Sequence, residues 1–174
     1  MAGSVAEFRI NISNLSEGIH EYSFEAEASK IDINEQVQGI VWINAKLDKS
    51  LRQIFLKSEI LAEGVFVCDR CLEEFHRKLN TSYSMMYVQD NRSTVDIKKD
   101  GEIQVLSADT NYIDLDDDVR QCVLLAIPQK LLCREECNGL CPICGTNRNT
   151  GNCSCSADVI DTRWDALKKL PHND

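Results

Sequence analysis

The sequence predicts an α+β fold. It indicates an antiparallel sheet or small open barrel in the N-terminal half, one central helix, a cysteine-rich region and a short C-terminal helix. Three observations carry this prediction: apolar residues alternate with polar ones in the first half, a single helical pattern ends at Pro128, and six of the nine cysteines lie between Cys133 and Cys155.

The strands are predicted from period-two alternation. Residues 8–12, 21–28 and 41–47 alternate apolar and polar side chains so that most of the apolar ones share one face, which is typical of half-buried antiparallel strands. Longer strands follow at 53–67 and 74–88, and Gly64 interrupts the first of them, which predicts a bulge. The polar stretch 89–112 is predicted to be a loop containing one short strand at 103–106.

A helix is predicted over about 115–127. Asp114 or Asp116 can cap it, and the acidic residues 116–118 lie in the first turn, where the helix dipole favours negative charge. One apolar face is shared by five residues: Leu115, Val119, Cys122, Val123 and Ala126.

A second helix is predicted over 157–170, where Trp164, Leu167 and Leu170 recur at helical spacing. The predicted organisation is a β-rich domain over 1–130 and a cysteine-rich tail over 131–174. We expect the tail to pack on the domain as one cooperative unit.

Composition and charge limit the class of protein. The chain has 174 residues with 43% hydrophobic and 27% charged residues, which is ordinary for a globular domain. No leader or membrane segment is visible, so we expect a cytoplasmic protein that does not bind membranes. Residues 130–174 hold equal numbers of acidic and basic residues, so the whole net charge of -9 lies in residues 1–129. This balance disfavours binding to phosphates through the overall surface and suits a basic protein partner.

The cysteines are spaced as metal ligands. Two cysteines separated by two residues in a turn bring their sulfurs to about 3.7 Å, which matches the edge of a tetrahedron around zinc. Disulfides are rare in the cytosol, so paired cysteines there indicate metal or redox chemistry. Eight thiols fit two four-thiolate sites, which predicts two zinc ions in a zinc-knuckle region held by Cys68, Cys71, Cys133, Cys137, Cys141, Cys144, Cys153 and Cys155. The ninth, Cys122, lies on the apolar helix face and is expected in the core.

Two partitions of the eight thiols are compatible with the spacing. In the first, Cys141, Cys144, Cys153 and Cys155 form one site and the other four form the second. In the other, the two knuckles pair with each other, Cys68 and Cys71 with Cys141 and Cys144, as in a zinc ribbon.

The motifs do not indicate an enzyme. All-cysteine ligation leaves no open position for a water molecule, and the sequence contains no phosphate-binding loop, nucleophile elbow or dinucleotide fingerprint. A redox-controlled zinc switch is the alternative role for the cysteines, because oxidation of paired thiols releases zinc.

The motifs occur in the order known for one family. Residues 63–75 (EGVFVCDRCLEEF), 113–133 (IDLDDDVRQCVLLAIPQKLLC), 137–149 (CNGLCPICGTNRN) and 161–170 (DTRWDALKKL) resemble the YceD-like family of large ribosomal RNA subunit accumulation proteins. The resemblance implies a non-enzymatic factor that acts in 23S rRNA accumulation or processing and in assembly of the large ribosomal subunit. It implies as partner the large-subunit rRNA or a pre-ribosomal particle, and it leaves open an acidic, chaperone-like binder of a basic ribosomal protein.

Direct binding of RNA by so acidic a chain needs a local patch. The candidates for contact with RNA or another partner are the polar and basic residues beside the two knuckles: Arg70, Arg77, Lys78, Asn147, Arg148 and Asn149.

Overall fold

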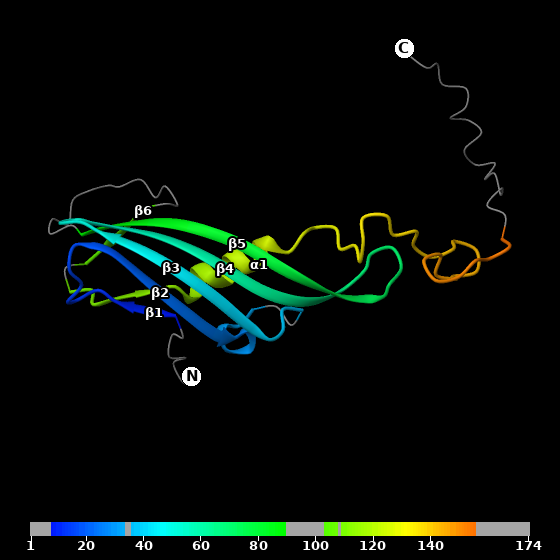
Figure 1. Ribbon diagram of the computed structural model, residues 1–174, viewed down its shortest axis with the longest axis horizontal. Coiled ribbons are helices and arrows are strands. Elements are labelled where there is room, and N and C mark those ends of the chain that lie inside the picture. The colour runs from blue at the N-terminus through cyan, green and yellow to red at the C-terminus, as the bar shows by residue number, and fades with distance from the viewer. Residues whose placement is uncertain (1–7, 34–35, 90–102, 108, 156–174) are drawn as a thin grey trace, which may run out of the picture.

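The computed structural model describes residues 8–33, 36–89, 103–107 and 109–155. The helix predicted over 157–170 lies outside these residues. The described chain is a sheet with one helix and two cysteine clusters, so the α+β class is confirmed at this level (Figure 1).

Five strands form the main sheet in the order β2-β3-β4-β5-β6. The first four are β2 (Gly18–Glu27), β3 (Ile40–Lys49), β4 (Gln53–Val67) and β5 (Glu74–Gln89), and each runs antiparallel to the next. Their alternating burial follows the alternating sequence, because every second side chain faces the core.

The short strand β6 (Ile103–Leu106) pairs with β5 in parallel, so the expectation of purely antiparallel pairing is wrong here. Parallel neighbours need a connection of a dozen or more residues, and residues 90–102 supply that length. The bulge predicted at Gly64 is also wrong. This glycine lies in regular register opposite Arg77, and a Cβ atom there would collide with the ring of Phe66.

The core lies on one face of the sheet. Helix α1 (Asp116–Ala126) packs over β5 and β4, and Leu115, Val119 and Val123 are buried there, as the apolar face predicted. A two-stranded ribbon, β1 (Arg9–Asn11) with β7 (Tyr112–Asp114), adds Ile10 and Ile113 to the same core. A short 3-10 helix, η1 (Ala28–Ile31), follows β2. No helix among the described residues has the length and apolar character needed to cross a membrane.

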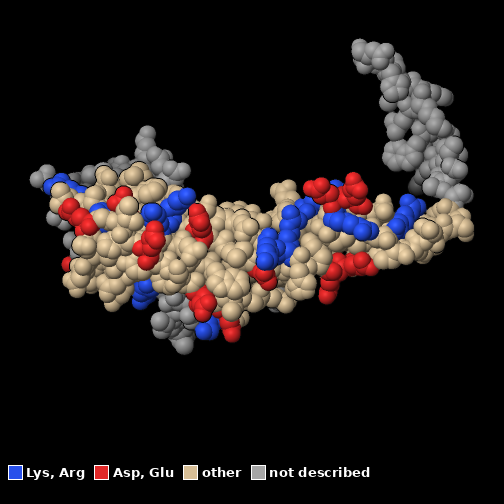
Figure 2. Space-filling view, in the orientation of Figure 1, with Lys and Arg blue, Asp and Glu red and all other residues tan. Residues whose placement is uncertain are grey.

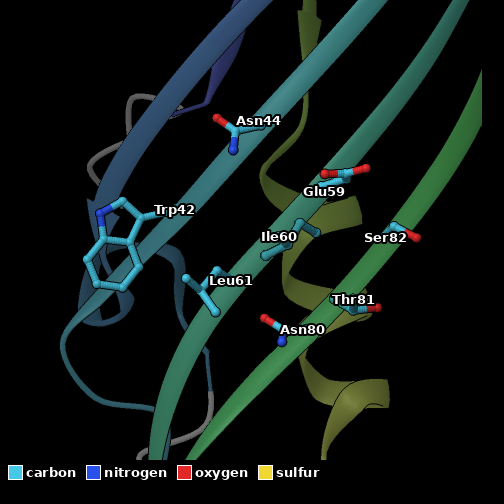
Figure 3. A pocket seen from close by; sticks show the side chains of 8 residues that line it. All are labelled: Trp42, Asn44, Glu59, Ile60, Leu61, Asn80, Thr81 and Ser82. Carbon is cyan, nitrogen blue, oxygen red and sulfur yellow. The ribbon is translucent and has the colours of Figure 1, made fainter.

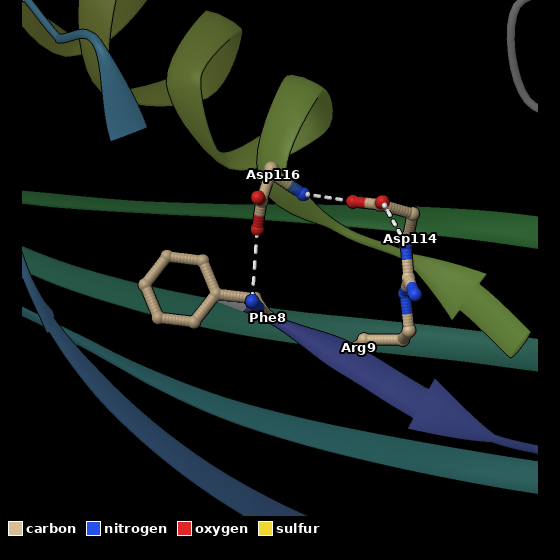
Figure 4. Close-up of polar contacts among 4 residues, drawn as sticks. All are labelled: Phe8, Arg9, Asp114 and Asp116. Carbon is tan, nitrogen blue, oxygen red and sulfur yellow. Dashed lines mark hydrogen bonds and ion pairs between the residues drawn. The ribbon is translucent and has the colours of Figure 1, made fainter. Parts of the chain in front are cut away.

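Phe8 fastens the start of α1 to the ribbon and the sheet. Its N–H donates to Asp116 Oδ1 at 2.8 Å (Figure 4). Its carbonyl accepts the N–H of Leu115 at 2.9 Å. Asp114 Oδ1 accepts the N–H of Asp116 at 3.1 Å. The N-cap position itself is Leu115, which has no side-chain capping hydrogen bond, so the prediction that Asp114 or Asp116 is the N-cap is wrong. The Phe8 ring lies edge-on to Phe24 of β2, with 6.1 Å between the ring centroids. These contacts fix the start of α1 on the ribbon and the sheet.

Replacing Phe8 by alanine tests this fastening. Phe8 is fully buried, so Phe8→Ala is expected to lower the free energy of unfolding by about 3–5 kcal/mol in urea denaturation followed by circular dichroism. The matched control is Phe55→Ala, because Phe55 lies on the other face of the sheet and is 44% exposed. Equal losses in the two variants would contradict the role given to Phe8.

Candidate metal centres

The tip of the β4–β5 hairpin presents the first pair of thiols. The N–H of Cys68 donates to Glu73 O at 2.9 Å, and the N–H of Leu72 donates to Cys68 O at 2.9 Å. Leu72 has a φ of 59°, a left-handed conformation that closes the turn after Cys71. Cys68 is fully buried and Cys71 is 3% exposed, so both sulfurs point away from water.

Four hydrogen bonds, two between backbone groups and two that use the side chains of Asp69 and Arg70, hold the segment after α1 against this tip. The N–H of Asp69 donates to Leu131 O at 2.8 Å, and the N–H of Leu131 donates to Asp69 Oδ2 at 2.7 Å. The guanidinium of Arg70 donates to Cys137 O at 2.8 Å, and the backbone carbonyl of Arg70 accepts the N–H of Leu140 at 3.1 Å. These contacts place the thiols of Cys133 and Cys137 over the hairpin tip.

The first cluster therefore consists of Cys68, Cys71, Cys133 and Cys137. Its sulfurs all lie within 4.8 Å of one another, with 3.8 Å between Cys68 and Cys137 and 3.7 Å between Cys71 and Cys133. A tetrahedral ion with sulfur ligands at about 2.3 Å has edges of about 3.7 Å, so the four thiols fit such an ion. The side chains of Phe75, Leu132 and Leu140 pack around the cluster.

The electrostatics of the first cluster also suit a cation. Burial raises the pKa of Cys68, but the backbone N–H groups of Cys133, Cys71 and Arg70 together outweigh it and lower this pKa to about 6. For Cys133, burial and then the neighbouring thiols raise the pKa to about 12. Because thiolates at this distance repel one another, all four ionise together only around a positive ion.

The second cluster consists of Cys141, Cys144, Cys153 and Cys155, whose sulfurs also lie within 4.8 Å of one another. The N–H of Cys141 donates to Thr146 O at 2.8 Å, and the N–H of Gly145 donates to Cys141 O at 2.9 Å. Gly145 has a φ of 74°, which glycine adopts without strain. The backbone N–H groups of Cys144 and Ile143 lower the pKa of Cys141 to about 6 in spite of its burial.

The two clusters differ in access to solvent. In the first, three of the four thiols are buried, whereas in the second Cys144 is exposed and Cys153 and Cys155 are half-buried. The grouping follows the first of the two partitions predicted from spacing, and the two knuckles do not share a cluster. The ninth cysteine, Cys122, packs at the edge of the core, as predicted.

The loop of the second cluster also touches the first. Asn149 Nδ2 donates to Cys137 Sγ at 3.2 Å, and Asn149 Oδ1 accepts the N–H of Asn138 at 2.9 Å. The N–H of Arg148 donates to Gly139 O at 2.9 Å, and its guanidinium lies 3.9 Å from Cys141 Sγ. N–H donors to thiolates stabilise the charged form, so this loop supports the ligands of both clusters.

Four of the six residues predicted to contact a partner have such internal roles. Arg70, Arg148 and Asn149 hold the clusters as described, and Asn147 Oδ1 accepts the N–H of Asn149 at 2.9 Å. Lys78 lies on the sheet, 3.6 Å from Glu63, and Arg77 is exposed beside it. The sequence did not predict the role of Asp69, whose carboxylate accepts the N–H of Leu131. Its position between Cys68 and Cys71 was the available signal.

These features define a class of protein: a sheet domain with two four-cysteine clusters, one of them shared between a hairpin tip and the segment after a helix. The chain belongs to the family described as large ribosomal RNA subunit accumulation protein YceD, whose model matches residues 56–171. The resemblance found in the motifs is therefore confirmed, and the name of the family links it to accumulation of the large ribosomal RNA.

Relatives occur among mycobacterial proteins. An uncharacterized protein of Mycobacterium tuberculosis is 26% identical over 134 residues, which cover 70% of this chain and 62% of the relative. An uncharacterized protein of Mycobacterium leprae is 24% identical over 106 residues, which cover 60% of this chain and 48% of the relative. The chain thus spans less than two thirds of these relatives. No solved structure matches it.

The contact between Asn149 and Cys137 generates a prediction. Asn149→Leu removes the N–H donor from the sulfur, and loss of such a partner typically weakens metal binding about 10–100-fold. We expect Cys68 and Cys137 to become reactive toward an alkylating reagent at a lower chelator concentration than in the unaltered protein, as read by mass spectrometry.

The control is Asn152→Leu, because Asn152 is exposed in the same loop and makes no side-chain hydrogen bond with the described residues. The prediction fails if both variants protect Cys68 and Cys137 equally well.

Proposed function

We propose that this protein promotes accumulation or processing of 23S rRNA, and so assembly of the large ribosomal subunit, without catalysing a reaction. The observation that supports this proposal is membership of the family over residues 56–171. The relatives carry no assigned activity, so they add nothing to the choice. A cytoplasmic location belongs to the same proposal.

The eight clustered cysteines are proposed to hold two zinc ions. Sulfur-only tetrahedral sites suit zinc or iron–sulfur clusters, and four thiolates around each zinc ion leave no open position for water or substrate. Such ions supply structure rather than chemistry. The first would join the tail (131–174) to the β-rich domain (1–130), which supports the proposal that the two unfold as one cooperative unit.

Two kinds of partner remain candidates within this function. Large-subunit rRNA or a pre-ribosomal particle is favoured by the family name. Contact through the knuckle end would use Arg77, whose side chain is exposed there. A basic ribosomal protein is favoured by the net charge of -9. This second candidate makes the protein an acidic holder for a component of the subunit.

Metal analysis tests the proposed cofactor. Elemental analysis of the purified chain is expected to give two zinc per chain, and Cys144→Ser is expected to lose one of them because it breaks the second cluster. The control is Cys122→Ser, which lies outside both clusters and should keep both ions. A count of one or none in the unaltered protein, or iron in place of zinc, would sink the proposal of two zinc ions.

Depletion of the protein in its host tests the proposed function. We expect the ratio of 23S to 16S rRNA to fall and free large subunits to decrease in sucrose gradients. Expression of the unaltered gene should restore both. Normal rRNA levels and normal subunit profiles in the depleted cells would contradict the proposal.

A further inference from the structure

The face of the sheet opposite α1 carries two adjoining depressions, of about 420 and 690 Å³. Both include Trp42, Asn44 and Leu61. Strand register places Glu25, Trp42 and Leu61 side by side across β2, β3 and β4, and Asn80 of β5 completes the row. Figure 3 shows the first depression on the strands, with Trp42, Asn44 and Leu61 on the side facing the viewer and the helix behind the sheet.

Trp42 gives this surface an aromatic centre. Its neighbours Val41 and Ile43 are fully buried under the helix side, whereas Trp42 points to the other side and is 37% exposed. The indole face of tryptophan is the best side-chain acceptor for a cation. Small polar residues surround it, since Ser23, Asn44 and Ser82 occupy the adjacent row.

The charges around Trp42 are mainly negative. Glu25, Glu59 and Glu63 line the depressions, and Lys78 is the one basic residue among the lining residues described. Lys78 lies 3.6 Å from Glu63 and Lys57 lies 3.6 Å from Glu59, and both lysines are more than half exposed. Exposed ion pairs contribute little, so an incoming cation can replace them. Figure 2 shows charges of both signs over the sheet with uncharged surface between them.

We propose that this face binds an arginine-bearing segment of a basic protein, with one guanidinium on the indole of Trp42 and paired with the carboxylates of Glu25 and Glu59. Arginine is preferred to lysine because its planar guanidinium stacks on aromatic rings and pairs with carboxylates through two hydrogen bonds. A phosphate backbone meets three carboxylates here and is repelled.

This surface would be the binding site for the basic ribosomal protein, the second candidate partner, and the inference rests on that part of the proposed function. It does not depend on the outcome of the depletion experiment, because binding is measured on the purified protein. If depleted cells kept a normal rRNA profile while the purified protein still bound the peptide, the proposed function would be contradicted and the proposed binding surface would stand.

The test uses the full chain with its metals and three probes of equal length: a labelled arginine-rich peptide, its lysine counterpart and single-stranded RNA. Fluorescence anisotropy at moderate salt is expected to rank the arginine peptide first. Trp42→Leu should weaken arginine-peptide binding about threefold to 30-fold, the range for a cation on an aromatic face. Trp42→Phe should restore part of the loss. Circular dichroism establishes that the variants fold.

A charge control accompanies the aromatic variants. Glu25→Gln should weaken binding about threefold, whereas Glu17→Gln, which removes an exposed acid outside the depressions, should leave it unchanged. The proposal is overturned if RNA binds more tightly than the arginine peptide, if Trp42→Leu binds the peptide as the unaltered protein does, or if Glu25→Gln and Glu17→Gln behave alike.

Discussion

The architecture depends on the join between the β4–β5 hairpin tip and the segment after α1. Asp69 and Leu131 exchange two hydrogen bonds across 62 positions of sequence, and Arg70 adds two more. Each such bond contributes about 1 kcal/mol net, so the four together do little more than offset the entropy of closing so long a loop. The bonds therefore set the geometry of the join. The proposed zinc ion on the four sulfurs that the join brings together would stabilise it much more, since a structural zinc site contributes on the order of 10 kcal/mol.

The sequence predicts the local features of the molecule well and the distant ones poorly. Strands such as β3 are predictable because one face is buried, which imposes alternation on every residue. The direction of β6 is not predictable from its own residues, because it depends on the path of the long connection between β5 and β6. Strand β7 has three residues, too few for a periodic pattern, and it exists because β1 pairs with it. The grouping of the eight thiols was left open by spacing and depends on the contact of Asp69 with Leu131.

Whether a polar or an aromatic side chain faces inward or outward is also hard to predict from the sequence. Asn149 and Arg148 look like surface residues because they are polar and follow a knuckle, yet their donors are directed at sulfur and backbone. Thiolates accept N–H groups, so polar residues beside a metal-ligand motif can face inward. Trp42 shows the reverse case. Its place in an alternating strand suggests core or cross-strand packing, but the helix covers one face of the sheet only, and Trp42 lies on the other.

The unequal burial of the two clusters has a kinetic consequence. A chelator or an oxidant meets Cys144 at the surface, whereas Cys68 is sealed between the hairpin tip and the chain above it. Metal removal or oxidation should therefore begin at the second cluster. Because Asn149 in the loop of the second cluster donates to Cys137 Sγ, loosening of that loop would next affect the first cluster. The difference in burial therefore sets the order in which a reagent from solution meets the two clusters, with the second cluster first.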